Sequence, residues 1–285
     1  MRLTPLALLV VPLLVATSAC SPKDEDPTAK STTKTASCAK ADLPLTTDGK
    51  LTIATDTPAF VPWFVDNDPS NGKGFESAVA YAVAGKLGFD KSEVAWIKEP
   101  FNNSYAPGAK KFDFDINQIS ITPERAKAVD FSTGYYSASQ AVVALKKKNL
   151  KPGSLAELKG LKLGAQTGTT SLTAIRDVIK PSQTPLVFPN SNVPKQALLN
   201  GQVDAFVVDL PTAFYLTGAE IKGSTIVGQF QPETGQKEEF GLLLEKGSDL
   251  TPCVDKALAS LKDDGTLAGL EKQWLSTTVD VPVLK

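Results

Sequence analysis

Histidine is missing from this chain altogether, and methionine and cysteine are scarce, with one and three residues among 285. Histidine is the commonest general base near neutral pH and a frequent zinc ligand, so its absence argues against both kinds of site. Net charge is also nearly absent, since 30 Lys and Arg side chains balance 31 Asp and Glu for a formal charge of −1. Such neutrality gives no electrostatic reason to expect nucleic acid as a partner. We expect neither a metal nor a cofactor.

Apolar runs long enough to matter for a membrane occur only at the N-terminus. Arg2 precedes an apolar stretch, Leu6 to Val15, which is followed by small residues and then by Cys20. This order is typical of an export signal, and the run is shorter than the roughly 20 residues of a membrane-spanning helix. We therefore predict a signal peptide over residues 1–19. Because Cys20 resembles the cysteine of a bacterial lipobox, we expect it to be lipidated; the alternative is an ordinary signal peptide cleaved near a cysteine.

The segment after Cys20 is rich in Ser, Thr, Pro, Lys and Asp and has no apolar periodicity. Such composition does not bury enough surface to fold, so residues 20–40 are expected to be a flexible linker. Cys38 and Cys253 then remain, and two remaining cysteines in an exported chain usually pair. We predict this disulfide, which would contribute about 4–5 kcal/mol by closing a long loop. The alternative is two unpaired thiols.

The rest of the chain is long enough for two domains, and its apolar patterns switch repeatedly between strand and helix periods. A change of block follows the triple lysine at 146–148. We expect strands at residues 51–55, 114–119, 141–145, 161–165, 186–188, 205–208, 224–227 and 240–244, and helices at residues 75–87, 169–179, 193–199, 211–216, 249–262 and 267–275. Strands that alternate with helices predict an α/β protein with mostly parallel sheets covered on both faces.

Two motifs indicate a site for a small anion or zwitterion. In Ser120-Ile-Thr-Pro-Glu-Arg125, Thr122 resembles an N-cap and the following proline an N1 residue, which places Arg125 in the first turn of a predicted helix. A guanidinium matches a carboxylate as a planar fork. In Gly168-Thr-Thr170 a turn opens another predicted helix, whose N-terminus also attracts an anion. If the motifs lie on separate lobes, they predict a cleft that closes on its ligand.

These motifs resemble those of the family 3 extracellular solute-binding proteins, which serve ABC importers of polar amino acids. The resemblance covers about residues 43–275, and its further marks are Gly74-Phe-Glu76, Phe112-Asp113, Val129-Asp-Phe-Ser132, Tyr135-Tyr136 and Val203-Asp-Ala205. It implies a two-lobed periplasmic-binding-protein type II fold with two crossover hinge strands, near residues 139–141 and 237–240. Lobe 1 would comprise residues 41–140 plus 240–285, and lobe 2 residues 141–239.

The resemblance also implies roles for individual residues. Arg125 would clamp the ligand α-carboxylate, together with Thr169 and Thr170, and Asp209 would accept the α-ammonium. Each has a plainer alternative: Arg125 pairs with Glu124 or Asp130, the threonines only cap their helix, and Asp209 caps the helix that follows it. Further candidate contacts come from the loops around the expected cleft: Ser120, Gln118, Asn117, Asp56, Phe60 and Trp63.

Some of these positions depart from the family pattern. Asn117 and Gln118 stand where several relatives carry small hydroxyl residues, so their amides either reach the ligand or only complete the strand end. Of the two aromatic residues in the Pro-rich first loop, Phe60 and Trp63, either could form a wall of the site or pack in the core. Glu76 is expected to lie at the head of its helix, where its charge suits the helix dipole.

The resemblance implies a monomeric, lipid-anchored receptor that captures a polar amino acid and delivers it to an ABC permease at the outer face of the cell membrane. An acidic partner such as Asp56 or Glu76 would suit a cationic side chain, whereas Asn117 and Gln118 would suit an amide or a glutamate. Two rivals remain: a receptor that signals to a membrane partner, and a dehydratase on the same fold. We expect no enzymatic activity.

Overall fold

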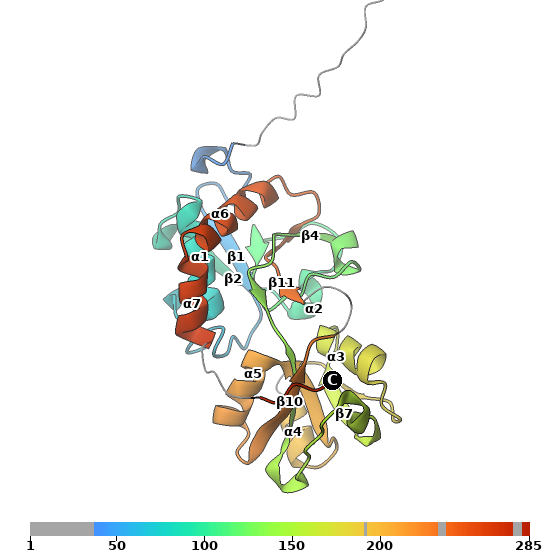
Figure 1. Ribbon diagram of the computed structural model, residues 1–285. Helices are drawn as coiled ribbons and strands as arrows, with labels where there is room; N and C mark the ends of the chain where they lie inside the picture. The colour runs from blue at the N-terminus through green and yellow to red at the C-terminus, as the bar shows by residue number, and fades with distance from the viewer. Residues whose placement is uncertain (1–36, 191–192, 233–237, 276–280) are drawn as a thin grey trace, which may run out of the picture. The chain divides into compact units, whose positions relative to one another are not determined.

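The computed structural model describes residues 37–190, 193–232, 238–275 and 281–285, which belong to one compact unit, Ala36–Lys285. The predicted signal peptide, residues 1–19, and the predicted lipidation site Cys20 lie outside the described residues. Two five-stranded sheets and a short two-stranded ribbon form the framework (Figure 1).

The first sheet has the order β2-β1-β3-β12-β4. Its strands are β1 (Leu51–Thr55), β2 (Val94–Lys98), β3 (Phe114–Asp115), β4 (Val129–Phe131) and β12 (Leu243–Glu245). Helices α1 (Phe75–Lys86), α6 (Thr251–Asp263) and α7 (Thr266–Leu275) pack together beside β1 and β2 (Figure 1). Apolar side chains of these helices and of β1 share one core. A short helix, α2 (Phe101–Ser104), follows β2.

The second sheet has the order β10-β6-β9-β7-β8. Its strands are β6 (Gln140–Leu145), β7 (Leu163–Gln166), β8 (Leu186–Phe188), β9 (Ala205–Asp209) and β10 (Ser224–Phe230). Its helices are α3 (Thr170–Ala174), continued by a π-helical turn, α4 (Val193–Leu199) and α5 (Leu210–Tyr215). Every residue of β6 is buried, and alternate residues enter two separate apolar clusters, which fits a strand covered on both faces.

All strands but one point in the same direction in each sheet, and the exceptions are β12 and β6. These are the strands that enter each sheet from the other part of the molecule. A strand that arrives from the edge where its neighbours end must run against them, which explains the mixed pairing. The segments leading into them, β5 (Tyr136–Ser137) and β11 (Glu239–Phe240), pair as an antiparallel ribbon. The two-lobed α/β fold with two crossover strands is therefore confirmed.

Several sequence expectations need correction at their edges. The strand expected at 114–119 stops at Asp115, and Gln118 adopts a left-handed backbone with φ of 48°. The helix expected after Pro123 is a single 3-10 turn, Arg125–Lys127. The strand expected at 240–244 divides into β11 and β12. Residues 119–121 bond to Glu239 and Gly241 at the crossover, a long-range pairing that local periodicity does not report.

Both ends of the described chain also differ from expectation. Residues 37–40, expected to belong to the flexible linker over residues 20–40, are folded, and a 3-10 helix spans Lys40–Asp42. Residues 281–285, expected in lobe 1 with 240–285, lie on the second sheet instead. Gln229 N donates to Pro282 O and Leu284 N donates to Gln229 O, both at 2.8 Å. The Leu284 side chain is buried in the core of that sheet, where it contacts the position of Gly228.

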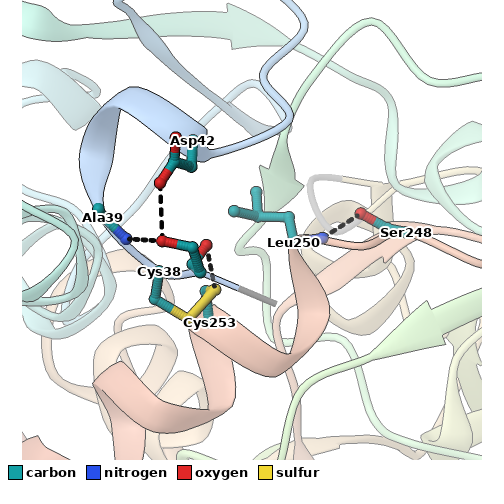
Figure 2. Close-up of a disulfide and its surroundings, with 7 residues drawn as sticks. Cys38, Ala39, Asp42, Ser248, Leu250 and Cys253 are labelled. Carbon is teal, nitrogen blue, oxygen red and sulfur yellow. Dashed lines mark hydrogen bonds between the residues drawn. A yellow bond between two sulfur atoms is a disulfide. The ribbon is translucent and has the colours of Figure 1, made fainter. Parts of the chain in front are cut away.

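The predicted disulfide between Cys38 and Cys253 is present (Figure 2). It joins the N-terminal segment to the first turn of α6, across a sequence separation of 215 residues. Beside the disulfide, Ser37 Oγ donates to Asp42 at 2.7 Å and accepts from Ala39 N. Figure 2 labels Ala39 and Asp42, which make these two bonds. The bond therefore anchors a segment that also has local structure of its own.

Candidate functional site

A cavity of about 100 Å³ lies between the two sheets and is lined by residues from both. Its walls come from the loops that follow β1 and β3 on one side, and β7 and β9 on the other. These are the carboxyl ends of parallel strands, where open α/β sheets place ligand groups. Of the site residues expected from the sequence, the structure brings together Asp56, Phe60, Asn117, Gln118, Ser120, Arg125, Thr169, Thr170 and Asp209.

Arg125 is buried beside the cavity and is held by backbone carbonyls from both sides. Its Nη1 donates to Ser120 O at 2.7 Å and its Nη2 to Gly168 O at 2.8 Å. The rings of Phe101 and Tyr105 lie 5.4 and 4.7 Å from the guanidinium carbon, which restricts its plane further. A guanidinium carries more N–H donors than these two carbonyls use, so it can still donate to a ligand. Burial lowers its pKa from the usual value.

A plainer role for Arg125, pairing with Glu124 or Asp130, is not what the structure shows. The nearby Asp130 pairs with Lys246 at 2.9 Å instead. The aromatic residues that flank Arg125 come from α2 and the residue after it, in the loop between β2 and β3. Gly168 approaches that loop so closely that a Cβ would lie 2.2 Å from Tyr105 Oη. Its φ of 74° favours glycine, and a Cβ here would also push the Tyr105 and Asn102 side chains away.

Two hydroxyls meet beside the guanidinium, one from each side of the cavity. Ser120 Oγ and Thr170 Oγ1 lie 3.3 Å apart. Both donate to the same carboxylate oxygen, Glu238 Oε1, and the bond from Ser120 is 2.5 Å long. Glu238 was not among the residues expected at the site, although it lies in the second predicted hinge segment.

Gln140, in the first predicted hinge segment, links this carboxylate to Asp209. Its Nε2 donates to Glu238 Oε2 at 2.9 Å and to Asp209 Oδ1 at 3.0 Å, while its Oε1 accepts from Ser171 Oγ at 2.6 Å. The Gln140 side chain is completely buried. Gln140 is not among the site residues expected from the sequence, where its one signal is that a glutamine opens an otherwise apolar strand.

Asp209 ends β9, and its side chain makes no capping hydrogen bond to α5, so the alternative of a simple N-cap does not hold. Burial is the main reason that its pKa is raised well above the usual range, and the nearby Glu238 carboxylate raises it further. Two carboxylates that share one amide donor create a place where a cation is favoured. Asp209 is therefore suited to accept an ammonium group.

The two threonines at the start of α3 do different things. Thr169 is the N-cap: its Oγ1 accepts from Leu172 N at 3.2 Å and donates to Gln166 O at 2.8 Å. Its hydroxyl hydrogen is thus already used. Thr170 donates its hydroxyl to the Glu238 carboxylate instead of to its own loop, so of the two threonines it is the one whose donor serves a carboxylate at the cavity.

Asn117 and Gln118 also differ in role. Glu76 Oε1 accepts from Gln118 N at 2.6 Å and from Tyr135 Oη, and Glu76 Oε2 accepts from Gln118 Nε2. Gln118 is therefore tied to the core, and burial raises the pKa of Glu76 to about 7. Asn117 is buried at the cavity wall, and within the described residues its Nδ2 has no acceptor. It is a donor ready for a ligand oxygen.

In the first loop, Asp56 and Phe60 line the cavity. Asp56 accepts from Thr57 N at 2.6 Å and from Phe101 N at 3.1 Å, so its carboxylate also fixes the start of α2. The Phe60 ring stacks on Tyr215, with centroids 5.8 Å apart and planes 14° apart.

Trp63 does not line the cavity, contrary to one of the two possibilities considered for it. Its side chain is completely buried between Phe75, Tyr136 and Phe240. The Trp63 backbone also packs on Gly74, where any Cβ would lie 2.4 Å from Trp63 O. Its Nε1 donates to Thr212 Oγ1 at 3.0 Å, which joins the first loop to α5.

Among the described residues, no group of three or more Asp, Glu or Cys side chains is placed to hold a metal ion. Within the same ranges, no helix combines the length and apolar character required to cross a membrane.

Known proteins have similar sequences and a similar fold. Residues 51–277 match the model of the bacterial extracellular solute-binding proteins, family 3. The L-cystine-binding protein TcyJ of Escherichia coli (strain K12) is 31% identical over 223 residues, which cover 77% of this chain and 80% of TcyJ. The glutamine-binding protein GlnH of Bacillus subtilis (strain 168) is 32% identical over 229 residues, covering 78% of this chain and 79% of GlnH.

Solved structures agree with this result. An ancestral arginine-binding protein bound to arginine is 34% identical, with a TM-score of 0.66 over 80% of this chain and 99% of that protein. The ancestral amino acid-binding protein AncCDT-1, a precursor of cyclohexadienyl dehydratase, is 31% identical, with a TM-score of 0.66 over 79% of this chain and 95% of that protein. These relatives are binding proteins. This chain belongs to the bacterial extracellular solute-binding proteins, family 3.

Proposed function

We propose that this protein captures a free polar amino acid between its two sheets and delivers it to an ABC permease. The observation that carries the proposal is the separation of charge within one cavity. Arg125, with the hydroxyls of Ser120 and Thr170, offers donors for a carboxylate, and Asp209 offers an acceptor for an ammonium. A zwitterion matches both ends, and its binding draws the two sides together by preferring the closed arrangement.

The rest of the cavity supports a polar ligand side chain. Phe60 supplies an apolar wall, whereas Asn117 offers an unused amide donor and Asp56 an acidic group. The named ligands of the relatives, cystine, glutamine and arginine, are all polar amino acids. We infer a binding role without catalysis, because the acidic side chains in and beside the cavity are engaged in holding loops and neighbouring side chains.

We also propose that the mature protein is monomeric and is lipidated on Cys20, which would hold it at the outer face of the membrane. The signal-like N-terminus and the small residues before Cys20 support this anchoring. Mass spectrometry of the mature N-terminus tests it, because an unmodified Cys20 would rule the anchor out.

The experiment for the binding function is a thermal-shift screen against the proteinogenic amino acids, cystine and ornithine, followed by calorimetry of any compound that raises the melting temperature. Arg125→Ala should weaken the binding of that compound at least about 30-fold, since truncating one partner of a buried charge pair costs about 2–5 kcal/mol. Arg176→Ala is the matched control, because Arg176 is an exposed arginine outside the cavity. Unchanged affinity in the folded Arg125 variant would refute its role, and no stabilisation by any compound would refute the amino acid assignment.

A further inference from the structure

Glu238 is surrounded by groups suited to a ligand carboxylate, although it belongs to the protein itself. Its carboxylate accepts from Ser120 Oγ, Thr170 Oγ1 and Gln140 Nε2. No lysine or arginine within the described residues forms an ion pair with it. This half-buried carboxylate is held by neutral donors and interacts electrostatically with the nearby Arg125 guanidinium without forming an ion pair. It occupies the same hydroxyls that the proposed function assigns to the ligand.

The two carboxylates exclude each other. A hydroxyl has a single hydrogen to donate, so Ser120 and Thr170 serve either Glu238 or an incoming carboxylate. Gln140 Nε2 is likewise shared with Asp209, which places two acidic side chains on one amide. A ligand carboxylate must therefore displace Glu238 before it can use both hydroxyls.

We propose that Glu238 is an internal substitute for the ligand carboxylate, which occupies the site in the empty protein and lowers the affinity for the ligand. The proposal rests on the proposed function, since it assumes that the ligand carries a carboxylate to this cavity. It also explains why a residue outside the two binding motifs reaches their side chains: Glu238 lies in the crossover that adjoins both lobes.

Glu238 further connects the two sides of the cavity. Ser120 follows the first sheet and Thr170 follows β7 of the second, so one carboxylate oxygen bonds across the cleft. This contact stabilises a closed arrangement without ligand, in competition with the liganded one. Loss of the Glu238 carboxylate should therefore have two effects: the empty protein should be less often closed, and its affinity for the ligand should rise.

The variant that tests this proposal is Glu238→Ala, with Glu239→Ala as a matched control that removes the same charge from the adjacent, exposed position. The probes are L-arginine and L-glutamine, each compared with its α-carboxamide in calorimetry. If the released conformer of Glu238 makes up about one tenth of the empty protein, its removal raises affinity about tenfold. The gain is expected for the probe with a carboxylate and not for the carboxamide, and the control should bind as the parent does.

A second readout needs no ligand. Small-angle scattering of the empty protein should give a larger radius of gyration for Glu238→Ala than for the parent and the control, with Glu238→Gln as a conservative variant that keeps the side-chain length. Weaker or unchanged binding by Glu238→Ala would overturn the proposal, because it would make Glu238 a ligand contact or a bystander. If the parent binds neither probe, the proposed function fails for these two amino acids. In that case an unchanged radius of gyration in Glu238→Ala would overturn the inference about Glu238 by itself.

Discussion

Replacing both cysteines of the disulfide by alanine tests how much the disulfide stabilises the protein by restricting its unfolded chain. The folded segment around Cys38 keeps other attachments after the replacement, including the Lys40–Glu93 ion pair at 2.5 Å and the buried Leu43. We therefore expect the native fold to persist. The loss should arise because the unfolded chain regains the freedom that the bond removes.

The magnitude follows from the separation of 215 residues between the two cysteines. In the chain-entropy model a loop of this length corresponds to about 5 kcal/mol at 25 °C, and measured values often fall below the model. We expect the Cys38→Ala/Cys253→Ala variant to lose about 3–5 kcal/mol in free energy of unfolding. For a domain of this size, that is a fall in melting temperature of about 10 °C.

Urea denaturation of the purified parent and variant measures the difference directly. A reductant should bring the parent to the stability of the variant and leave the variant unchanged. Ligand affinity should be the same in both, because neither cysteine lines the cavity. A difference below about 1 kcal/mol would refute the reasoning, because the bond would then not restrict the unfolded chain as the model requires.

Two further predictions concern pH. The pKa of Asp209 is raised in the empty cavity, and a bound ammonium favours its charged form. Amino acid affinity should therefore fall as pH is lowered through that raised pKa, by up to about tenfold per pH unit. Calorimetry of the parent and of Asp209→Asn at several pH values measures this fall, and equal pH slopes in the two proteins would contradict the prediction. Glu76 is buried with a pKa of about 7, so its contribution to stability is present below about pH 4.5 and is lost as pH rises through 7. Relative to the parent, Glu76→Gln should gain about 3 kcal/mol in free energy of unfolding between pH 4.5 and pH 8, and parallel urea curves at all pH values would contradict this.

The sequence determined the features that depend on near neighbours. The strands β1 and β8 and the helix α4 have the predicted bounds, and Thr169 caps α3 as its motif indicated. Apolar periodicity and caps are properties of a few consecutive residues, so they are visible without the fold. The Ser120–Arg125 and Gly168–Thr170 motifs likewise predicted which loops would form the cavity.

Only the tertiary structure decided which side chains meet. Glu238 reaches Ser120 over 118 residues of sequence and Thr170 over 68, and no local pattern marks a glutamate for such contacts. Trp63 lies in the core rather than at the cavity, because the space between Phe75, Tyr136 and Phe240 accepts its ring. Periodicity fixes the face on which a side chain lies, whereas its partners depend on how distant strands and crossovers pack against one another.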